Sequence, residues 1–407
     1  MRNLARFALS FGAKVTGSDD GYNGINPPFL EEVVIKKRFC AKELIDVDLV
    51  VTTSAIPDTH EQLLIIDKLG KKRIKREEFL DMISREFETF ITVSGTHGKT
   101  TTCGMLGEIL NSTNIHPAVH LGGEYGNFFP FSKKVLVSEA CEYKKSYLSL
   151  TPDVCIILNT EYDHPDCYKS QKEVNDTYLR FARKTKSDGV VISPYPILSG
   201  TENLVVGRDI VASKVRLECG TYSFVPVING VEKERIHLLV PGKHNVQNAL
   251  FAILVARYLK IDYSHVKSGL ERFSGVNLRY TIKNLSCGKV IVDYAHHPSE
   301  IGAVLNTVNE IDTTPRVFFQ PHTYSRTKAF FNQFVEVLKT CKPLYIVEEY
   351  PARESPQDGV DAYTLYLSLK DKTEAYYLTL EEAYAVIKEQ HPLTLVLGAG
   401  NISQIIQ

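Results

Sequence analysis

A short glycine-containing segment, Gly95-Thr-His-Gly98-Lys99-Thr100-Thr101, constrains the fold of this chain more than any other feature. It follows the apolar, β-branched run at residues 90–93 and precedes a helical pattern with apolar residues on one face. A strand, a tight turn and the start of a helix place backbone N–H groups and the positive end of the helix dipole where phosphate binds. The segment therefore predicts an α/β domain with a nucleotide phosphate loop.

Two residues of this loop carry specific chemistry. Lys99 supplies a positive charge for phosphate, and the Thr100 hydroxyl is a suitable Mg²⁺ ligand. The strict P-loop pattern has a further glycine where Val93 stands, so the loop is a compressed G-x-x-G-K-T variant. An ordinary turn between a strand and a helix does not explain a lysine at the helix start, where the dipole disfavours it.

Length and composition bound the class of protein. A chain of 407 residues is too long for one ordinary core, and about three domains are expected. The net charge of −1 does not favour a nucleic-acid partner, and the eight cysteines form no C-x-x-C pair, which is typical of reduced thiols. The longest apolar run, residues 249–256, is far shorter than the ~20 residues of a membrane span. We therefore expect a cytoplasmic protein that binds neither nucleic acid nor membrane.

Strand and helix patterns divide the chain into three parts, residues 1–86, 87–275 and 276–407. Helical stretches separate the strands throughout, which implies parallel sheets. The middle part also has short β segments with Gly and Asn turns after its last buried strand. The strands expected from apolar runs lie at residues 14–18, 48–52, 135–137, 154–158, 289–292, 316–319, 344–347 and 393–397.

Polar groups follow each strand of the middle part. Glu139 and Glu142 follow one strand, and Glu161, Asp163 and His164 follow the next. Ligands of open parallel sheets bind beyond the carboxyl ends of the strands, so these groups and the phosphate loop are expected to share one Mg²⁺–nucleotide site. Glu142 is the preferred ligand, with Glu139 as the alternative. His164 is the preferred third group, although Asp163 or Glu161 fits equally from the residues alone.

Two strand-end motifs of the last part also suggest ligand contacts. Asp293 stands before the adjacent His296 and His297 and is suited to accept hydrogen bonds from a ribose. Adjacent histidines do not easily face one metal ion, so we do not expect them to form a zinc site. Arg326 follows another strand, and its planar fork suits a carboxylate or a phosphate, although a surface salt bridge is an equal alternative.

In their order along the chain, these motifs resemble the Mur ligase family of peptidoglycan synthesis. Besides the phosphate loop, the resemblance rests on Ser138-Glu139-Ala-Cys-Glu142, Asp163-His164, Pro241-Gly-Lys-His244-Asn245-Val-Gln-Asn248, Asp293-Tyr-Ala-His-His-Pro298, Gln320-Pro-His322-Thr-Tyr-Ser-Arg326-Thr and Ala352-Arg-Glu354. It implies a Rossmann-like UDP-sugar domain at residues 1–86, a central P-loop ATPase with a small β region at 87–275, and a Rossmann-like amino-acid domain at 276–407. Family members open with a strand and a Gly-rich turn that hold the UDP pyrophosphate. We expect the N-terminal domain to be truncated at that first strand.

The resemblance also implies roles for individual residues. Thr100 and Glu142 bind one Mg²⁺, and His164 binds a second metal ion. Arg326, with His322 and Arg279, holds the incoming amino acid or the acyl group. The implied catalytic residues are Lys99, Glu142, His164 and Arg326. The implied ATP contacts are Gly95, Thr96, His97, Gly98, Lys99, Thr100 and Thr101 at the phosphates, His244 and Asn248 at the adenine, and Asp293 at the ribose.

The activity implied by the resemblance is ATP-dependent carbon–nitrogen ligation with ATP and Mg²⁺ as cofactors. The lactyl carboxylate of UDP-N-acetylmuramate becomes an acyl phosphate and is then joined to L-alanine, by a monomer or a weak homodimer. Two alternatives stay open: a recycling ligase that adds a preformed tripeptide to the same sugar, and a non-catalytic relative that only binds nucleotide.

Overall fold

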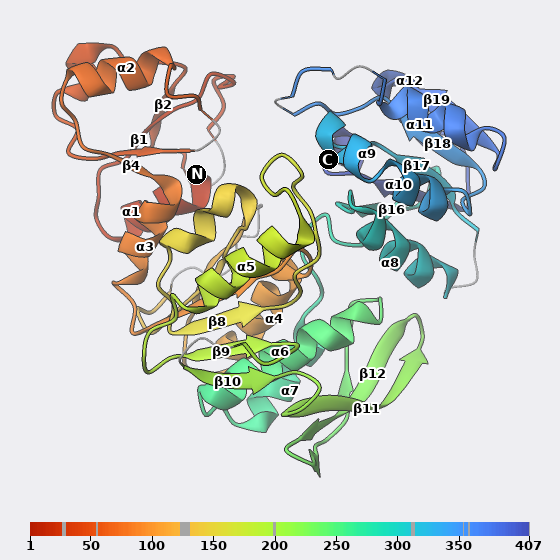
Figure 1. Ribbon diagram of the computed structural model, residues 1–407, viewed down its shortest axis with the longest axis horizontal. Coiled ribbons are helices and arrows are strands. Elements are labelled where there is room, and N and C mark those ends of the chain that lie inside the picture. Colours follow the sequence, from red (N-terminus) through yellow and green to blue (C-terminus); the bar gives the residue numbers. More distant parts are fainter. Residues whose placement is uncertain are drawn as a thin grey trace.

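The protein has an α/β fold of three domains, as predicted, arranged along the chain in the order N-terminal, central and C-terminal (Figure 1). The computed structural model describes residues 1–26, 30–53, 56–122, 131–197, 201–310, 314–352, 354–356 and 359–406. In Figure 1 the N-terminal domain lies at the upper left, the C-terminal domain at the upper right, and the central domain below them.

The N-terminal domain contains two separate pairs of parallel strands. β1 (Thr16–Ser18) pairs with β2 (Val34–Lys36), and β3 (Val50–Thr52) pairs with β4 (Arg73–Lys75). The predicted strands at 14–18 and 48–52 are thus confirmed. Its helices are α1 (Arg2–Ser10), the 3₁₀ helix η1 (Ala41–Leu44), α2 (Glu61–Lys68) and α3 (Arg76–Ser84).

The central sheet carries the phosphate loop and is parallel throughout. Its order is β10-β9-β8-β5-β7-β6, so β5 lies between β7 and β8, and the carboxyl ends of these three strands meet at one edge. Continuous apolar runs form these strands because helices cover both faces of the sheet. The bounds are β5 (Thr89–Ser94), β6 (Ala118–His120), β7 (Val135–Glu139), β8 (Val154–Ile157), β9 (Val190–Ser193) and β10 (Glu202–Val205).

Two hydrophobic cores lie on the two faces of the central sheet. One core packs α4 (Lys99–Asn111), α6 (His244–Tyr258) and α7 (Tyr263–Arg272) against the sheet, and the other packs α5 (Gln171–Ala182) and the 3₁₀ helix η2 (Tyr143–Ser149). Helices α1 and α3 join the second core, so the N-terminal domain is anchored on the central domain. An antiparallel unit follows the parallel sheet: β11 (Ile210–Glu218), β12 (Thr221–Ile228), β13 (Val231–Glu232) and β14 (Ile236–His237).

The C-terminal sheet is mixed rather than wholly parallel. Its order is β15-β16-β20-β17-β18-β19, and the edge strand β15 runs antiparallel to β16 while the other pairs are parallel. The strands are β15 (Thr281–Leu285), β16 (Gly288–Asp293), β17 (Arg316–Phe319), β18 (Leu344–Val347), β19 (Ala375–Leu378) and β20 (Leu393–Leu397). The helices are α8 (Pro298–Asn309), α9 (Tyr324–Ala329), α10 (Phe331–Leu338), α11 (Ala362–Leu369), α12 (Leu380–Ile387) and the 3₁₀ helix η3 (Asn401–Ile406).

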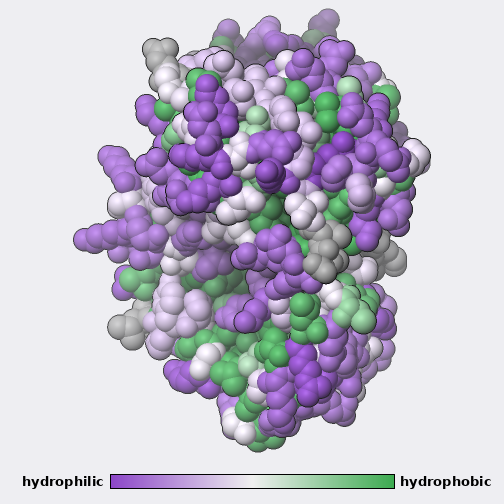
Figure 2. All heavy atoms as spheres, turned by 90° about the vertical axis from the view of Figure 1, so that its right-hand side faces the viewer, coloured by the Kyte–Doolittle hydropathy of each residue, from purple (hydrophilic) through white to green (hydrophobic). Residues whose placement is uncertain are grey.

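Helices α8 and α9 bring the C-terminal domain onto the central domain. The ring of Tyr162, in the loop after β8, contacts the ring of Phe330 with centroids 5.8 Å apart. Tyr222 of β12 donates a hydrogen bond of 2.6 Å to Glu310 at the end of α8. Figure 2 shows the right-hand face of the molecule, where polar side chains predominate and apolar ones gather in the lower part, at the level of the antiparallel unit.

Candidate active site

The phosphate loop connects β5 to α4 through two glycines with left-handed backbone. Gly95 has a φ of +137° and Gly98 a φ of +84°. A Cβ atom at Gly98 would lie 2.7 Å from Oδ1 of Asn248, so both the conformation and the close approach of α6 require glycine. Helix α4 begins at Lys99, with Gly98 as its N-cap. The loop therefore presents the free N–H groups of a helix start, as the sequence predicted.

Lys99 lies at the centre of a buried charge cluster. Its ammonium donates to the carbonyl oxygens of Gly95 and Thr96 at 2.5 and 3.1 Å and to both carboxylate oxygens of Glu142 at 3.1 and 2.9 Å. Burial opposes the charge of Lys99, but the facing carboxylate of Glu142 outweighs it and raises the lysine pKa to about 12. Burial likewise acts to raise the pKa of Glu142, but Lys99 and His164 lower it to about 2. Both groups are therefore ionised at neutral pH.

The donors around Glu142 suit a magnesium ion. The carboxylate of Glu142 is 5% exposed, and Nε2 of His164 lies 3.5 Å from it. Glu139 reaches the same strand end, and its Oε1 is buried without a hydrogen-bond partner among the described residues. Two carboxylates and the hydroxyl of Thr100 at the helix start are the oxygen ligands that Mg²⁺ prefers. His164 has a φ of +54°, a strained conformation of the kind that clusters at functional sites.

Arg326 of the C-terminal domain forms a salt bridge with Asp163 of the central domain. Its Nε and NH2 donate to the two oxygens of Asp163 at 3.0 and 3.3 Å, and both residues are buried. Burial opposes ionisation of Asp163, but Arg326 outweighs it and holds the pKa of that carboxyl well below its usual range. NH1 of Arg326 also lies 3.1 Å from Nδ1 of His322, whose ring stacks on Tyr350. Of the two roles left open for Arg326, a surface salt bridge is excluded, because the pair that it forms is buried between two domains.

The remaining predicted ATP contacts lie beside the domain junction. Nδ2 of Asn248 donates to Oδ1 of Asn245 at 3.0 Å. The carboxylate of Asp293 accepts hydrogen bonds from the backbone N–H groups of Tyr280 and Ala295, both at 2.7 Å. Burial raises the pKa of Asp293, and the positive charge of Arg279, which acts to lower it, offsets this effect only in part.

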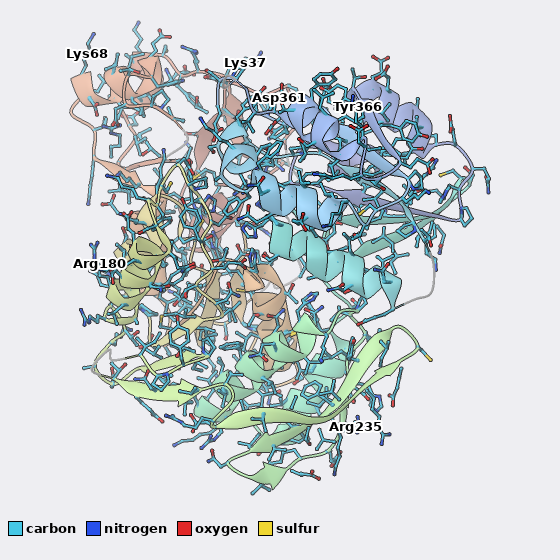
Figure 3. All side chains as sticks on the ribbon, turned by 45° about the vertical axis from the view of Figure 1, so that its right-hand side comes forward. Lys37, Lys68, Arg180, Arg235, Asp361 and Tyr366 are labelled. Carbon is cyan, nitrogen blue, oxygen red and sulfur yellow. The ribbon has the colours of Figure 1, made fainter. Side chains whose placement is uncertain are left out.

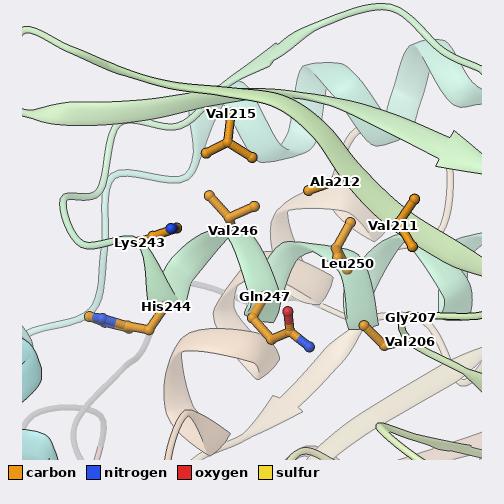
Figure 4. A pocket seen from close by; sticks show the side chains of 10 residues that line it. All are labelled: Val206, Gly207, Val211, Ala212, Val215, Lys243, His244, Val246, Gln247 and Leu250. Carbon is orange, nitrogen blue, oxygen red and sulfur yellow. The ribbon is translucent and has the colours of Figure 1, made fainter.

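A pocket of about 570 Å³ opens between α6 and β11, next to His244 (Figure 4). Burial lowers the pKa of His244, and Arg279 adds to this effect, so the imidazole is neutral at pH 7. Apolar side chains form most of the lining, and polar groups come from the first turn of α6. The lining residues are Val206, Gly207, Val211, Ala212, Val215, Lys243, His244, Val246, Gln247 and Leu250.

The structure places His97 differently from its neighbours in the phosphate loop. Its ring extends to the C-terminal domain, with Nδ1 3.0 Å from Oε1 of Glu300 and Nε2 2.9 Å from Oε2 of Glu161. Burial acts to lower the pKa of His97, but the two carboxylates outweigh it and raise it to about 9. Glu161, one of the alternatives to His164 at the metal site, therefore pairs with His97. Sequence reasoning missed Glu300, whose only signal is its place in the capping box of α8.

One residue of the predicted motifs, Arg353, lies outside the described residues. Five of the candidate residues lie along one continuous edge. Lys99, Glu142, His164, Asp163 and Arg326 follow one another there, because Nε2 of His164 lies 3.5 Å from Glu142 and 3.7 Å from Asp163. Within the part of the chain that the structure describes, no helix is long and apolar enough to cross a bilayer.

Comparison with known proteins agrees with this arrangement. Residues 93–256 match the Mur ligase middle domain, and residues 279–402 match the Mur ligase, glutamate ligase domain. The chain is 33% identical to the UDP-N-acetylmuramate–L-alanine ligase of Lachnospira eligens, over 100% of this chain and 94% of that protein, and 35% identical to that of Clostridium beijerinckii, over 99% and 93%.

Solved structures agree as well. The crystal structure of UDP-N-acetylmuramate–alanine ligase from Thermotoga maritima superposes with a TM-score of 0.82 at 26% identity, over 100% of this chain and 94% of that one. A murein peptide ligase from Psychrobacter arcticus, at 20% identity and a TM-score of 0.72, covers 100% and 94% and shows the same fold. The phosphate loop, the three-domain fold and these full-length matches establish that the chain belongs to the Mur ligase family.

Proposed function

We propose that this protein joins L-alanine to the lactyl carboxylate of UDP-N-acetylmuramate at the cost of ATP, in the cytoplasm, as a step of peptidoglycan precursor synthesis. The observation that carries the proposal is the match over essentially the whole chain to enzymes named for this reaction. The Lys99–Glu142 pair at the phosphate loop supports it, because a nucleotide-binding relative without activity has no need of a buried acid beside the loop lysine. The proposed domain bounds are residues 1–86, 87–275 and 276–407.

The central domain is proposed to hold the nucleotide. The N–H groups of residues 95–101 and the ammonium of Lys99 bind the phosphates, because the helix start and the lysine together offset their charge. His97 belongs to this loop and ties it to the C-terminal domain. His244 and Asn248 contact the adenine beside the α6 pocket, and Asp293 accepts a hydrogen bond from the ribose.

Thr100 and Glu142 are proposed to hold Mg²⁺, and His164 a second divalent ion. Bound metal supplies positive charge that reduces the repulsion between the phosphates and the substrate carboxylate. In the structure Lys99 neutralises Glu142, so a phosphate that draws Lys99 away leaves Glu142 free as a ligand. The oxygen-rich donor set around Glu142 suits this role.

The reaction proposed here has two chemical steps. The lactyl carboxylate attacks the γ-phosphorus of ATP, which gives an acyl phosphate and ADP. The amine of L-alanine then attacks the acyl carbon and phosphate leaves. Because water competes with the amine, the closed junction between the central and C-terminal domains protects the intermediate. Arg326, with His322 and Arg279, orients the carboxylate of alanine or the acyl group from the C-terminal side.

A coupled assay for ADP release tests the proposal. The purified full-length chain is given ATP, Mg²⁺ and UDP-N-acetylmuramate with L-alanine, glycine, L-serine or a preformed murein tripeptide. We expect ADP release with L-alanine and formation of the amide product by mass spectrometry. Faster release with the tripeptide would favour the recycling ligase. Release of ADP with no amino-acid-dependent product under any condition would reject ligation.

A further inference from the structure

We propose that Glu300 is a positioning residue for the ligation. Through His97 and Arg279, its carboxylate fixes the phosphate loop relative to the side chain that orients the acyl group or the alanine. Glu300 lies in the first turn of α8, in the C-terminal domain, and its side chain is 12% exposed. This role rests on the proposed function, whereas the contacts that carry it do not.

The first contact of Glu300 crosses the domain junction. Its Oε1 accepts a hydrogen bond of 3.0 Å from Nδ1 of His97, which belongs to the phosphate loop. Nε2, on the opposite edge of the ring, lies 2.9 Å from Oε2 of Glu161, which belongs to the central domain itself. Burial acts to lower the pKa of His97, but the two carboxylates raise it to about 9, so the imidazole is a cation at pH 7 and donates to both. A charge-assisted hydrogen bond thus holds the phosphate loop from the C-terminal domain.

The second contact of Glu300 is with Arg279. NH1 of this arginine lies 3.7 Å from the same Oε1, and its guanidinium lies over the ring of Tyr294, 5.2 Å from the centroid. The two neighbours in the chain, Leu278 and Tyr280, have φ values of +61° and +51°, which is a strained backbone for residues with side chains. Such strain persists only where surrounding contacts hold the segment. Glu300 and Tyr294 therefore determine where Arg279 lies.

The other oxygen of Glu300 anchors the carboxylate to the backbone of its own domain. Oε2 accepts hydrogen bonds from the backbone N–H groups of His296 at 3.1 Å and of His297, the N-cap of α8, at 3.4 Å. These bonds complete the capping box of the helix. Burial acts to raise the pKa of Glu300, but the charge of His97 outweighs it and holds the pKa of that carboxyl well below its usual range. The ionised carboxylate is thus fixed to α8 by one oxygen and faces two cations with the other.

These contacts bear on the reaction because its two partners are bound from different domains. On the proposed roles, the phosphate loop holds ATP from the central domain, and Arg279 orients the acyl group or the alanine from the C-terminal domain. Attack requires the reacting atoms to lie roughly 3–3.5 Å apart, and a displacement of about 1 Å costs on the order of 100-fold in rate. A carboxylate that contacts both binding elements sets their separation. Glu300 should therefore affect kcat more than the KM for ATP, because Lys99 and the loop N–H groups still bind the phosphates without it.

Glu300→Gln separates the charge of this residue from its capping role, because glutamine also serves at this position of a capping box. In the ADP-release assay we expect kcat to fall about tenfold or more while the KM for ATP stays within about threefold of the parent value. The matched control is Glu382→Gln, an exposed acid at the same capping-box position of α12, which should keep the kcat and KM of the parent. A kcat of Glu300→Gln equal to that of the parent would reduce Glu300 to a helix cap and overturn the proposal.

Two variants of His97 test the same contact from the other side of the junction. Asparagine places an amide N–H near the position of Nδ1 and keeps a donor for Glu300, whereas glutamine places one near Nε2 and keeps a donor for Glu161. Both variants should be slower than the parent, and His97→Asn should have the higher kcat of the two. The reverse order would contradict the role of Glu300, even if the Glu300 variants fail to fold.

The ring of His97 reports the contact without turnover. In NMR spectra of the full-length chain with labelled histidine, the signal that is missing from His97→Gln identifies this ring. We expect it to titrate at least about one pH unit lower in Glu300→Gln than in the parent, and at the parent value in Glu382→Gln. An unchanged titration in Glu300→Gln, with amide product formed by the parent, would overturn this inference alone. Absence of product from the parent would reject the proposed function, and this role with it.

Discussion

The salt bridge between Asp163 and Arg326 should control how firmly the C-terminal domain closes on the central domain. Both side chains are nearly inaccessible, 6% and 4% exposed, and two N–H groups donate to the carboxylate at 3.0 and 3.3 Å. Removing one member of a buried ion pair costs about 3–5 kcal/mol when the other stays buried. Arg326 is able to regain water if the domains separate, and it keeps the carbonyl oxygen of His322 as an acceptor. We therefore expect Asp163→Asn to destabilise the closed state by about 2–4 kcal/mol.

This cost corresponds to a roughly 30- to 900-fold shift of the closed-to-open equilibrium. Energy transfer between a dye at position 180 on α5 and a dye at position 363 on α11 reports the separation of the two domains. Figure 3 labels Arg180 and also Tyr366, which lies on the same helix as position 363. We expect lower transfer efficiency in Asp163→Asn without ligands. Asp166→Asn, an exposed acid in the same loop, is the matched control and should behave as the parent.

The pKa of Asp163 determines the pH dependence of this contact. The pKa of Asp163 is depressed in the folded state, so its contribution is present above the unfolded value of 3.8 and is lost only as pH falls below that value. Closure should therefore be constant from pH 6 to 8 as far as Asp163 is concerned. An energy-transfer distribution for Asp163→Asn that matches both the parent and Asp166→Asn would refute the role of this pair.

Four further substitutions test single groups, three of them in the site and one, Glu349, outside it. Lys99→Ala should abolish ATP-dependent phosphate release, and near-normal rates would contradict its phosphate role. Glu142→Ala should sharply raise the Mg²⁺ concentration needed for half-maximal rate, whereas an unchanged requirement would move the ligand role to Glu139. Gly98→Ala should weaken ATP binding at least about tenfold by calorimetry, because its φ of +84° and the 2.7 Å approach to α6 both exclude a Cβ. Burial raises the pKa of Glu349 to about 7, so the folded protein keeps a proton there that the unfolded chain loses near pH 4.5. The free energy of unfolding should therefore fall as pH rises from about 4.5 to 7. In thermal melts, Glu349→Gln should weaken this dependence of the melting temperature on pH.

The strands that the sequence predicted are those with continuous apolar runs. Residues 135–137, 154–158, 316–319 and 393–397 all form strands buried on both faces, where only Arg316 and Thr394, both buried, interrupt the apolar pattern. One buried strand with that signal was interpreted wrongly, because β9 (Val-Val-Ile-Ser) was placed among the short β segments and is a parallel strand of the central sheet. Other missed strands lack the signal. β15, with the sequence Thr-Ile-Lys-Asn-Leu, is an exposed antiparallel edge, and β6 has only three residues. Edge strands and very short strands are paired by tertiary context, which local pattern does not contain.

The candidate site was predictable where a motif follows a strand and unpredictable where two domains meet. Lys99 and Glu142 follow neighbouring strands of one parallel sheet, so the sheet topology alone brings them together. The partners of Asp163 and His97 are Arg326 and Glu300, each more than 150 residues away and in another domain. Nothing in either segment specifies which acid meets which base, because that choice depends on how the domains dock.

The charges along the site edge suggest how ligands replace internal partners. Lys99 is neutralised by Glu142, and Arg326 by Asp163, while His164 lies between the two acids. On the proposed roles, a phosphate that takes Lys99 would release Glu142 for a divalent ion, and a substrate carboxylate that takes Arg326 would release Asp163 toward His164. Each ligand charge would thus replace a protein charge of the same sign, and Lys99 and Arg326 would stay paired during the exchange. If the proposed roles hold, this balance keeps the site closed and its charges paired before its anionic ligands arrive.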